Sequence, residues 1–209
     1  TSMTTVGQIT SLLTATTTPI LFSALSRLQD DKTAFNELFF KFQKLVGILV
    51  IPLGVGIFCF RDFVTEILLG HQWFEAANFI GIWGLTSSIT IVLSHYCSEV
   101  YRSMGKPKLS VLAQLLHIIV LCPAMIIATR YDWTTIYITR SIVRLELVLV
   151  NLAIMYFIVK ISPKMMIANI TPSLIAAGMM GIIATMLLPL NPSNLWSIFT
   201  ITTCSIAYI

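Results

Sequence analysis

The stretch from Leu109 to Thr129 has the sequence LSVLAQLLHIIVLCPAMIIAT, which contains no Asp, Glu, Lys or Arg. A helix of about 20 residues crosses the hydrocarbon core of a bilayer, which is about 30 Å thick, so this stretch predicts one transmembrane helix. Six similar stretches accompany it. The chain is therefore predicted to be an all-α, polytopic membrane protein with about seven transmembrane helices. The predicted spans are roughly Met3–Leu25, Phe42–Phe60, Ala76–Val100, Leu109–Thr129, Trp133–Val159, Ile167–Leu190 and Leu195–Ile209.

The composition supports this fold class. Of the 209 residues, 56% are hydrophobic and only 11% are charged, whereas a soluble domain carries about 25% charged residues. The net charge of +4 does not indicate nucleic-acid binding, because the basic residues lie beside apolar spans and form no patch interleaved with aromatic residues. We therefore expect membrane lipids, and no nucleic acid, among the partners.

Lys and Arg are unevenly distributed among the gaps between the predicted spans. The first, third and fifth gaps hold nine of these residues, whereas the second and fourth hold two. Because loops rich in Lys and Arg stay in the cytoplasm, the odd-numbered gaps are predicted to be cytoplasmic and the first span to run from outside to inside. The nine are Arg27, Lys32, Lys41, Lys44, Arg102, Lys106, Lys108, Lys160 and Lys164, and the two are Arg61 and Arg130.

The first gap also carries an amphipathic pattern. From Asp31 to Val46, apolar residues such as Phe35, Leu38 and Phe39 recur at helical spacing, with charged residues between them. This pattern is typical of a helix at a membrane surface. We interpret residues 31–45 as an interfacial helix that lies in the headgroup layer before the chain turns into the second span.

Charged side chains within spans are the main candidates for a functional site, because inserting one costs at least about 2.5 kcal/mol. Arg140 and Arg144 are four residues apart and lie on one face of the fifth predicted span. They predict a site for an anionic group. The alternatives are an ion pair with Glu146, an ion pair with a carboxylate in the missing part of the protein, or snorkelling of Arg140 to the outer interface. Glu99 and Arg102, three apart at the inner end of the third span, are predicted to pair with each other.

The sequence contains no recognisable catalytic or metal-binding motif. The four cysteines lack CxxC spacing, and the three histidines lack an HExxH motif. We interpret the cysteines as small packing residues and the histidines within spans as satisfied polar groups. We accordingly expect no catalytic residue, no metal, no cofactor and no enzymatic activity.

Four motifs resemble those of a known family. They are LFSALSRLQDD at Leu21–Asp31, PLGVG at Pro52–Gly56, LLGHQWFEAA at Leu68–Ala77 and YRSMGKPK at Tyr101–Lys108. Their order and separation are similar to those in the C-terminal half of oligosaccharide flippases of the O-antigen and teichuronic-acid type. These flippases form the polysaccharide transporter branch of the multidrug/oligosaccharidyl-lipid/polysaccharide (MOP) superfamily. Ser23 stands where the first motif usually has proline, so the resemblance does not extend to a kink there.

The resemblance implies a fourteen-span, MATE-like transporter of the bacterial cytoplasmic (inner) membrane, of which this chain supplies spans eight to fourteen. Residues 1–160 would form the C-terminal transport lobe with five spans, and residues 161–209 two additional spans, the last one truncated. Since the chain starts with Thr1 and stops within an apolar stretch, we expect it to be a portion of a longer protein. The N-terminal lobe of that protein would be its partner.

The resemblance also implies a function, namely the movement of undecaprenyl-pyrophosphate-linked oligosaccharides from the cytoplasmic to the periplasmic leaflet by alternating access. Arg144 and Arg140 would then bind the pyrophosphate of this lipid-linked oligosaccharide. Glu146, Glu99 and Arg102 would serve as coupling or ion-pair residues.

Two other functions fit the sequence. A membrane enzyme of glycan assembly, such as an O-antigen polymerase or ligase, would need a large outer loop with catalytic Arg or His, and the predicted outer gaps are short. A cation-coupled drug exporter of the same superfamily would need acidic residues in its cavity, for which Glu146 is the candidate within a span.

The predicted topology is testable by cysteine labelling in a protein whose own four cysteines are replaced. Gln29→Cys and Lys106→Cys should react with a membrane-impermeant thiol reagent only from the cytoplasmic side, and Gln72→Cys only from the outside, because the positive-inside rule orients the loops. Labelling of Gln72→Cys and Lys106→Cys from the same side would contradict the predicted topology.

Overall fold

The computed structural model describes residues 15, 17–188 and 194–208, and every regular element within these ranges is a helix. Five helices are long and apolar enough to cross a membrane, namely Lys32–Cys59, His71–Ser103, Lys108–Ala128, Trp133–Val159 and Pro163–Leu187. A helix satisfies its own backbone hydrogen bonds, as a segment in hydrocarbon must. The predicted all-α membrane fold is confirmed.

The structure does not confirm the other two predicted spans as full crossings. Most of Met3–Leu25 lies outside the described residues, and the part that is described belongs to a short apolar helix, Thr17–Ser26. The last predicted span corresponds to α9 (Asn194–Tyr208), which has 15 residues, fewer than the about 20 that a full crossing needs. The five long helices match five predicted spans, and the count of seven stays a prediction.

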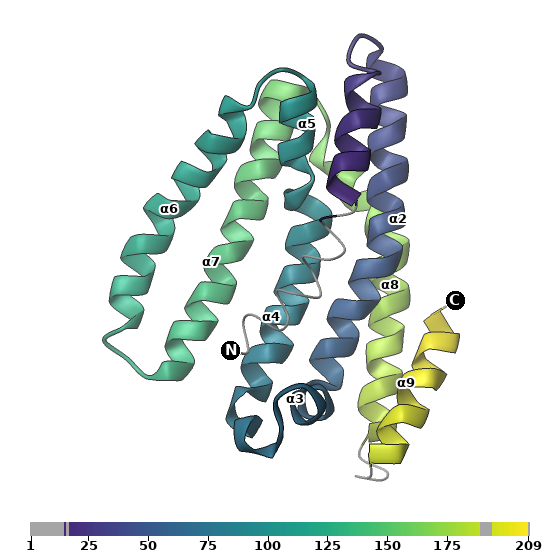
Figure 1. The fold of residues 1–209 in the computed structure, drawn as a ribbon, viewed down its shortest axis with the longest axis vertical. Helices are drawn as coiled ribbons and strands as arrows, with labels where there is room; N and C mark the ends of the chain where they lie inside the picture. Colours follow the sequence, from purple (N-terminus) through teal and green to yellow (C-terminus); the bar gives the residue numbers. More distant parts are fainter. Residues whose placement is uncertain (1–14, 16, 189–193, 209) are drawn as a thin grey trace.

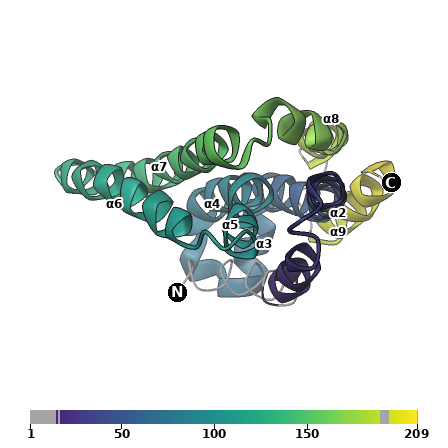
Figure 2. The same ribbon diagram turned by 90° about the horizontal axis from the view of Figure 1, so that it is seen from above.

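The long helices pack side by side, as Figure 1 shows, with α2 in contact with α4 and α8, and α7 in contact with α4 and α6. Seen from above in Figure 2, the α6–α7 pair extends to one side of the central helices and α8 and α9 lie on the other. In chain order, the elements are α2 (Lys32–Cys59), α3 (Arg61–Leu69), η1 (His71–Ala76), α4 (Ala77–Thr90), η2 (Ile91–His95), α5 (Cys97–Ser103), α6 (Lys108–Ala128), α7 (Trp133–Ile154), η3 (Met155–Val159), α8 (Pro163–Leu187) and α9.

The predicted interfacial helix at 31–45 is wrong in one respect. Residues 32–45 are helical, but α2 continues without a break to Cys59 and forms a single helix of 28 residues. Phe35 and Phe39 are buried in the same apolar core as Leu21 and Leu25 of the helix Thr17–Ser26. Because protein covers this apolar face, the helix has no need to lie flat in the headgroup layer to bury it.

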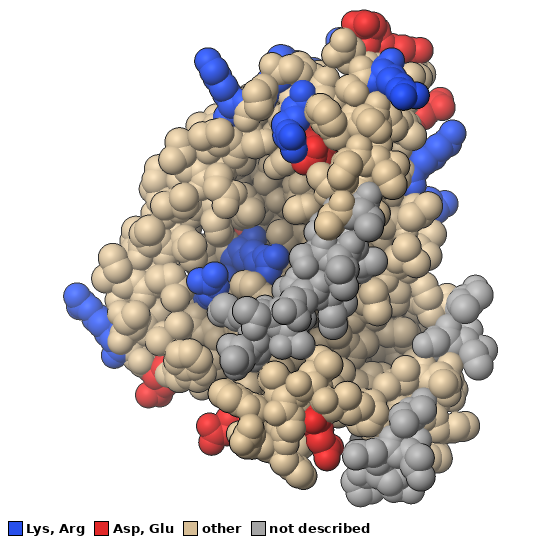
Figure 3. All heavy atoms as spheres, viewed as in Figure 1, with Lys and Arg blue, Asp and Glu red and all other residues tan. Residues whose placement is uncertain are grey.

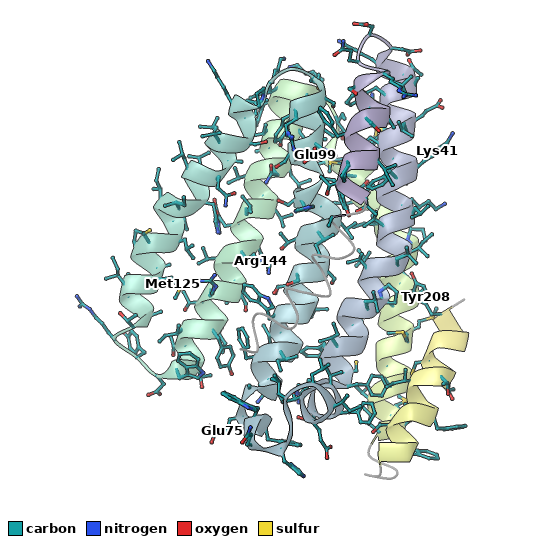
Figure 4. All side chains as sticks on the ribbon, viewed as in Figure 1. Lys41, Glu75, Glu99, Met125, Arg144 and Tyr208 are labelled. Atoms are coloured by element: carbon teal, nitrogen blue, oxygen red, sulfur yellow. The ribbon has the colours of Figure 1, made fainter. Side chains whose placement is uncertain are left out.

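A proline within α2 shows how the bundle satisfies its backbone. Pro52 has no N–H, so the carbonyl oxygen of Ile48, four residues earlier, loses its helical donor. The hydroxyl of Tyr208 on α9 donates a hydrogen bond of 2.9 Å to this oxygen, and Figure 4 shows the labelled Tyr208 at the end of α9 that approaches α2. A side chain from another helix thus replaces the missing bond, as a proline in lipid requires.

Glycines allow α2 and α4 to pack closely. A Cβ atom on Gly54 of α2 would overlap the side chain of Ser88, and one on Gly84 of α4 would lie 2.6 Å from Ile57 Cγ2. Small residues at such a crossing let two helix backbones approach each other. Gly178 on α8 is different, because a Cβ there would have no neighbour within 4 Å.

The basic loops gather at one end of the molecule. The turn that precedes α2 and the link between α5 and α6 lie at the upper end of Figure 1, whereas α3 and the link between α6 and α7 lie at the lower end. On the face that Figure 3 shows, Lys and Arg lie mostly toward the upper end, apart from a group in a central hollow and one side chain at the lower left. This arrangement is the one that the positive-inside distribution requires.

The contact between α2 and α4 gives a stability prediction. Gly54→Ala should lower the thermal unfolding midpoint of the detergent-purified protein, because the added methyl group overlaps Ser88 and forces the two helices apart, at a cost of about 1–3 kcal/mol. Gly178→Ala is the matched control and should leave the midpoint unchanged or slightly raised, because alanine is the better helix former. Equal midpoints for both variants would contradict the packing described for α2 and α4.

Candidate functional site

A polar cavity of about 420 Å³ lies within the membrane-spanning part of the molecule. One wall comes from α4, η2 and α5, and the other from α6 and α7. The central hollow of Figure 3 contains basic atoms, well away from the charged ends of the molecule. The polar residues that line the cavity and bear on its chemistry are Ser94, His95, His117, Arg140, Arg144 and Asn151.

A π-helical turn forms part of the first wall. The helix that contains α4 and α5 changes at Ile91–His95 to a π-helix, and Ile91, Ser94 and His95 of this turn all line the cavity. A π-helical turn is wider than an α-helical one and is frequent at functional sites. It changes which residues of the helix face the cavity, a change that the sequence pattern did not reveal.

Arg144 crosses the space between α7 and α4. Its Nη1 donates a hydrogen bond of 2.8 Å to Oγ of Ser87, and its Cζ lies 4.5 Å from the centre of the Trp83 ring. Cζ of Arg140 lies 5.6 Å from the same ring centre. Cation–π contacts of this kind contribute about 0.5–2 kcal/mol each. Figure 4 shows Arg144 near the middle of α7, far from either end of the helix.

Glu146 does not neutralise these arginines. Within the described residues, no carboxylate lies within 4.0 Å of either guanidinium. Glu146 points to α6, where its Oε2 lies 2.9 Å from Nδ1 of His117. The alternative of an ion pair between the arginines and Glu146 is therefore wrong. Arg140 lines the cavity and lies beside Trp83, and its snorkelling to the outer interface stays a prediction.

Glu99 and Arg102 form the contact that their spacing predicts. Nη1 of Arg102 lies 3.2 Å from both carboxylate oxygens of Glu99, and Glu99 is buried. Figure 4 places Glu99 toward the upper end of the molecule, well above Arg144. The structure thus brings Arg140 and Arg144 together at the cavity, and it places the Glu99–Arg102 pair outside the cavity wall.

Asn151 organises a second polar cluster that the sequence reasoning missed. Its Nδ2 donates to Oγ of Ser94 at 2.8 Å, and the hydroxyl of Tyr101 donates to its Oδ1 at 3.0 Å. All three residues are buried, and they join α7 to η2 and α5. The available signal was a lone amide within an apolar stretch, since amides in spans commonly form hydrogen bonds between helices. Trp83 could not have been singled out in this way, because aromatic residues are common in membrane-spanning helices.

The contact between His117 and Glu146 gives a prediction for a double-mutant cycle. His117→Ala and Glu146→Ala should each lower the free energy of unfolding by about 1–3 kcal/mol, because each leaves its partly buried partner without its hydrogen bond. The double variant should lose less than the sum of the two. The measurement is thermal or denaturant unfolding of the purified protein, and the exposed Gln114→Ala, on the same helix, is the control. Strict additivity would show that the two side chains do not interact.

Residues 1–78 match the model of a protein family described as polysaccharide biosynthesis protein. The match includes three of the four motifs, those at Leu21–Asp31, Pro52–Gly56 and Leu68–Ala77. No curated protein and no solved structure matches the chain. The cavity is built from Trp83 to Asn151, beyond the matched residues, so its chemistry is argued from its geometry alone.

Proposed function

We propose that the protein is a membrane transporter that moves undecaprenyl-pyrophosphate-linked oligosaccharides across the bacterial cytoplasmic membrane by alternating access. The observation that carries the proposal is the pair of guanidinium groups, Arg140 and Arg144, in a cavity between spans where the described residues place no carboxylate beside them. The partial match to polysaccharide biosynthesis proteins supports the same pathway class.

The arginine pair is costly for a membrane protein to bury. A charged side chain near the bilayer centre costs at least about 2.5 kcal/mol, and such residues usually pair with an opposite charge. Within the described residues, Arg144 donates a hydrogen bond to Ser87 and lies over the Trp83 ring, and neither contact supplies a negative charge. A pair of cations that lowers stability and lacks an internal anion is best explained by an anion that arrives with the substrate.

The chemistry of arginine favours a phosphate group as this anion. The planar guanidinium donates two parallel hydrogen bonds to phosphate or carboxylate oxygens, and charge-assisted bonds of this type are about twice as strong as neutral ones. Ser87 and Trp83 hold Arg144 in place without neutralising it. The cavity volume of about 420 Å³ lies within the range of about 300–1,000 Å³ that is usual for small-molecule sites, so it suits a pyrophosphate and the sugar next to it.

The position of the cavity suits alternating access. Within the described residues, the α6–α7 pair packs on the rest of the bundle mainly through α4, η2 and α5, and the cavity lies at this contact. A tilt of the α6–α7 pair relative to α4 would change the access to the cavity while each helix keeps its own hydrogen bonds. Such rigid-body movement of packed helices is a common form of conformational change.

The transport proposal predicts a separation of function from stability. Arg144→Gln should reduce export of lipid-linked oligosaccharide by about tenfold or more, because a charge-assisted hydrogen bond contributes about 1.5–3 kcal/mol. Its thermal midpoint should stay the same or rise, since the variant removes an uncompensated charge. Arg144→Lys should export more than Arg144→Gln but less than the native protein, because lysine keeps the charge but cannot donate the two parallel hydrogen bonds of a guanidinium. Arg140→Gln should have the smaller effect of the two.

The measurement is complementation in a strain that lacks the gene, with lipid-linked repeat units quantified on each side of the membrane. The strain should accumulate these units on the cytoplasmic side. Arg130→Gln, an exposed arginine outside the cavity, is the control and should export normally. Accumulation of single repeat units on the periplasmic side would favour a polymerase or ligase, and loss of the Arg144→Gln protein from the membrane would favour a structural role.

A further inference from the structure

A second basic site lies at the loop end of α2, independent of the cavity. A groove of about 550 Å³ runs between the first half of α2 and the chain segment that enters α8. Four lysines line it, three from α2 and one from the end of η3, against a single acidic residue, Glu37. The lysines are Lys32, Lys41, Lys44 and Lys160.

The lysines converge on the groove from two separate segments. Lys41 and Lys44, three residues apart, lie on one face of α2, and Lys160 reaches the same groove from a segment more than a hundred residues later. All three side chains are exposed, and in the described part of the chain none of them is in an ion pair with Glu37. The positive-inside rule accounts for lysines at this end, but it does not require them to face one groove.

Lys160 occupies an unusual backbone position. Its backbone has φ 68° and ψ 28°, which lies in the left-handed helical region. Among the described residues, it is the one non-glycine residue with positive φ. Glycine or asparagine is the ordinary residue where a helix ends in this way, because a side chain with a Cβ atom is disfavoured there. A lysine at this position therefore suggests that its charge has a use, and outliers of this kind cluster at functional sites.

The start of α8 adds to the positive potential of the groove. Ser162 precedes Pro163 as the N-cap residue and makes no side-chain hydrogen bond to the helix, and Ser162 itself lines the groove. The first N–H groups of a 25-residue helix and its dipole both favour an anion close by. This contribution supplements the lysines, which carry the charge.

The apolar surface around the groove indicates a lipid rather than a soluble anion. Phe40, Ile161 and Met165 line the groove beside the lysines, and exposed Leu45 and Leu49 continue along α2 toward the middle of the membrane-spanning region. In Figure 4, the labelled Lys41 projects from the upper half of α2 toward the outside of the molecule. Basic residues at the cytoplasmic surface attract the anionic headgroups of the inner leaflet.

We propose that this groove binds the headgroup of an anionic phospholipid from the surrounding membrane, with Lys41, Lys44 and Lys160 around the phosphate and the acyl chains along α2. The site is separate from the cavity of Arg140 and Arg144, and it does not depend on the proposed transport function. Its ligand is a structural or regulatory lipid rather than the transported molecule.

Lys160→Gly gives an unusually clean test, because glycine fits the left-handed backbone better than lysine. The variant should keep or raise the thermal midpoint while it loses lipid. Lys44→Gln, on the exposed side of α2, is a second variant with no backbone effect. Lys164→Gln is the matched control, because Lys164 lies at the same end of the protein, on α8, but does not line the groove.

The measurement is native mass spectrometry of the delipidated protein in detergent, mixed with equal amounts of phosphatidylglycerol and phosphatidylcholine. The native protein should retain phosphatidylglycerol preferentially. Lys160→Gly and Lys44→Gln should each weaken this retention about fivefold, which corresponds to about 1 kcal/mol for one lysine at a membrane surface, and Lys164→Gln should not.

Three results would overturn the proposal. These are equal retention of both lipids by the native protein, the same loss in Lys164→Gln as in the groove variants, and full displacement of phosphatidylglycerol by inorganic phosphate, which would identify a soluble anion as the ligand. Measuring export by Lys160→Gly separates the lipid proposal from the transport proposal. Loss of lipid retention with normal export would support the lipid groove and would not bear on the role of Arg144.

Discussion

The contact between α2 and α4 fixes the geometry on which the cavity depends. Gly54 and Gly84 remove the side chains that would hold the two helices apart, and Ser88 fills the space beside Gly54. The residue before it points in a different direction, because successive residues of a helix are about 100° apart, and Ser87 accepts the hydrogen bond of Arg144 from α7. Two adjacent serines on α4 thus belong to two interfaces. Ser88 packs against α2, and Ser87 forms a hydrogen bond with α7.

The charged groups that face the polar side of α4 do not neutralise one another. Arg144 and Arg140 share the Trp83 ring, while Glu146, only two residues from Arg144, turns to His117 on α6. Residues two apart on a helix point in different directions, so one face of α7 carries cations to the cavity and the adjacent face carries a carboxylate to its neighbour. The separation leaves the two guanidinium charges of the cavity without a carboxylate beside them in the described part of the chain.

The two basic sites of the molecule use different cations for physical reasons. Arginine is more weakly hydrated than lysine and is always charged, and its planar guanidinium can donate two parallel hydrogen bonds, which would suit the proposed phosphate site in the cavity. Lysine in the groove between α2 and α8 is strongly hydrated and flexible, which suits the wet boundary between headgroups and water. The proposed transport site and the proposed lipid site would therefore respond differently to an Arg-to-Lys or Lys-to-Arg exchange.

The sequence by itself determined the class of fold, the segregation of basic loops and the placement of Arg140 and Arg144 on one face of a span. Apolar length, loop charge and the four-residue spacing of Arg140 and Arg144 are local properties, and hydrocarbon allows a spanning segment little choice but a helix. The prediction that Glu99 and Arg102 pair was equally local, and the structure shows their contact.

Only the tertiary structure decided which groups meet across helices. Helical periodicity gives the face on which a residue lies, but not the helix that covers that face. This is why the apolar side of residues 31–45 was assigned to lipid when it packs on the helix Thr17–Ser26. For the same reason the partner of Glu146 was His117 rather than an arginine, and the turn at Ile91–His95 and the cluster around Asn151 were not foreseen. The rotation of each helix and the distance between neighbouring helices set these contacts. Both quantities depend on packing at sites such as Gly54, which lies far along the chain from the residues that make the contacts.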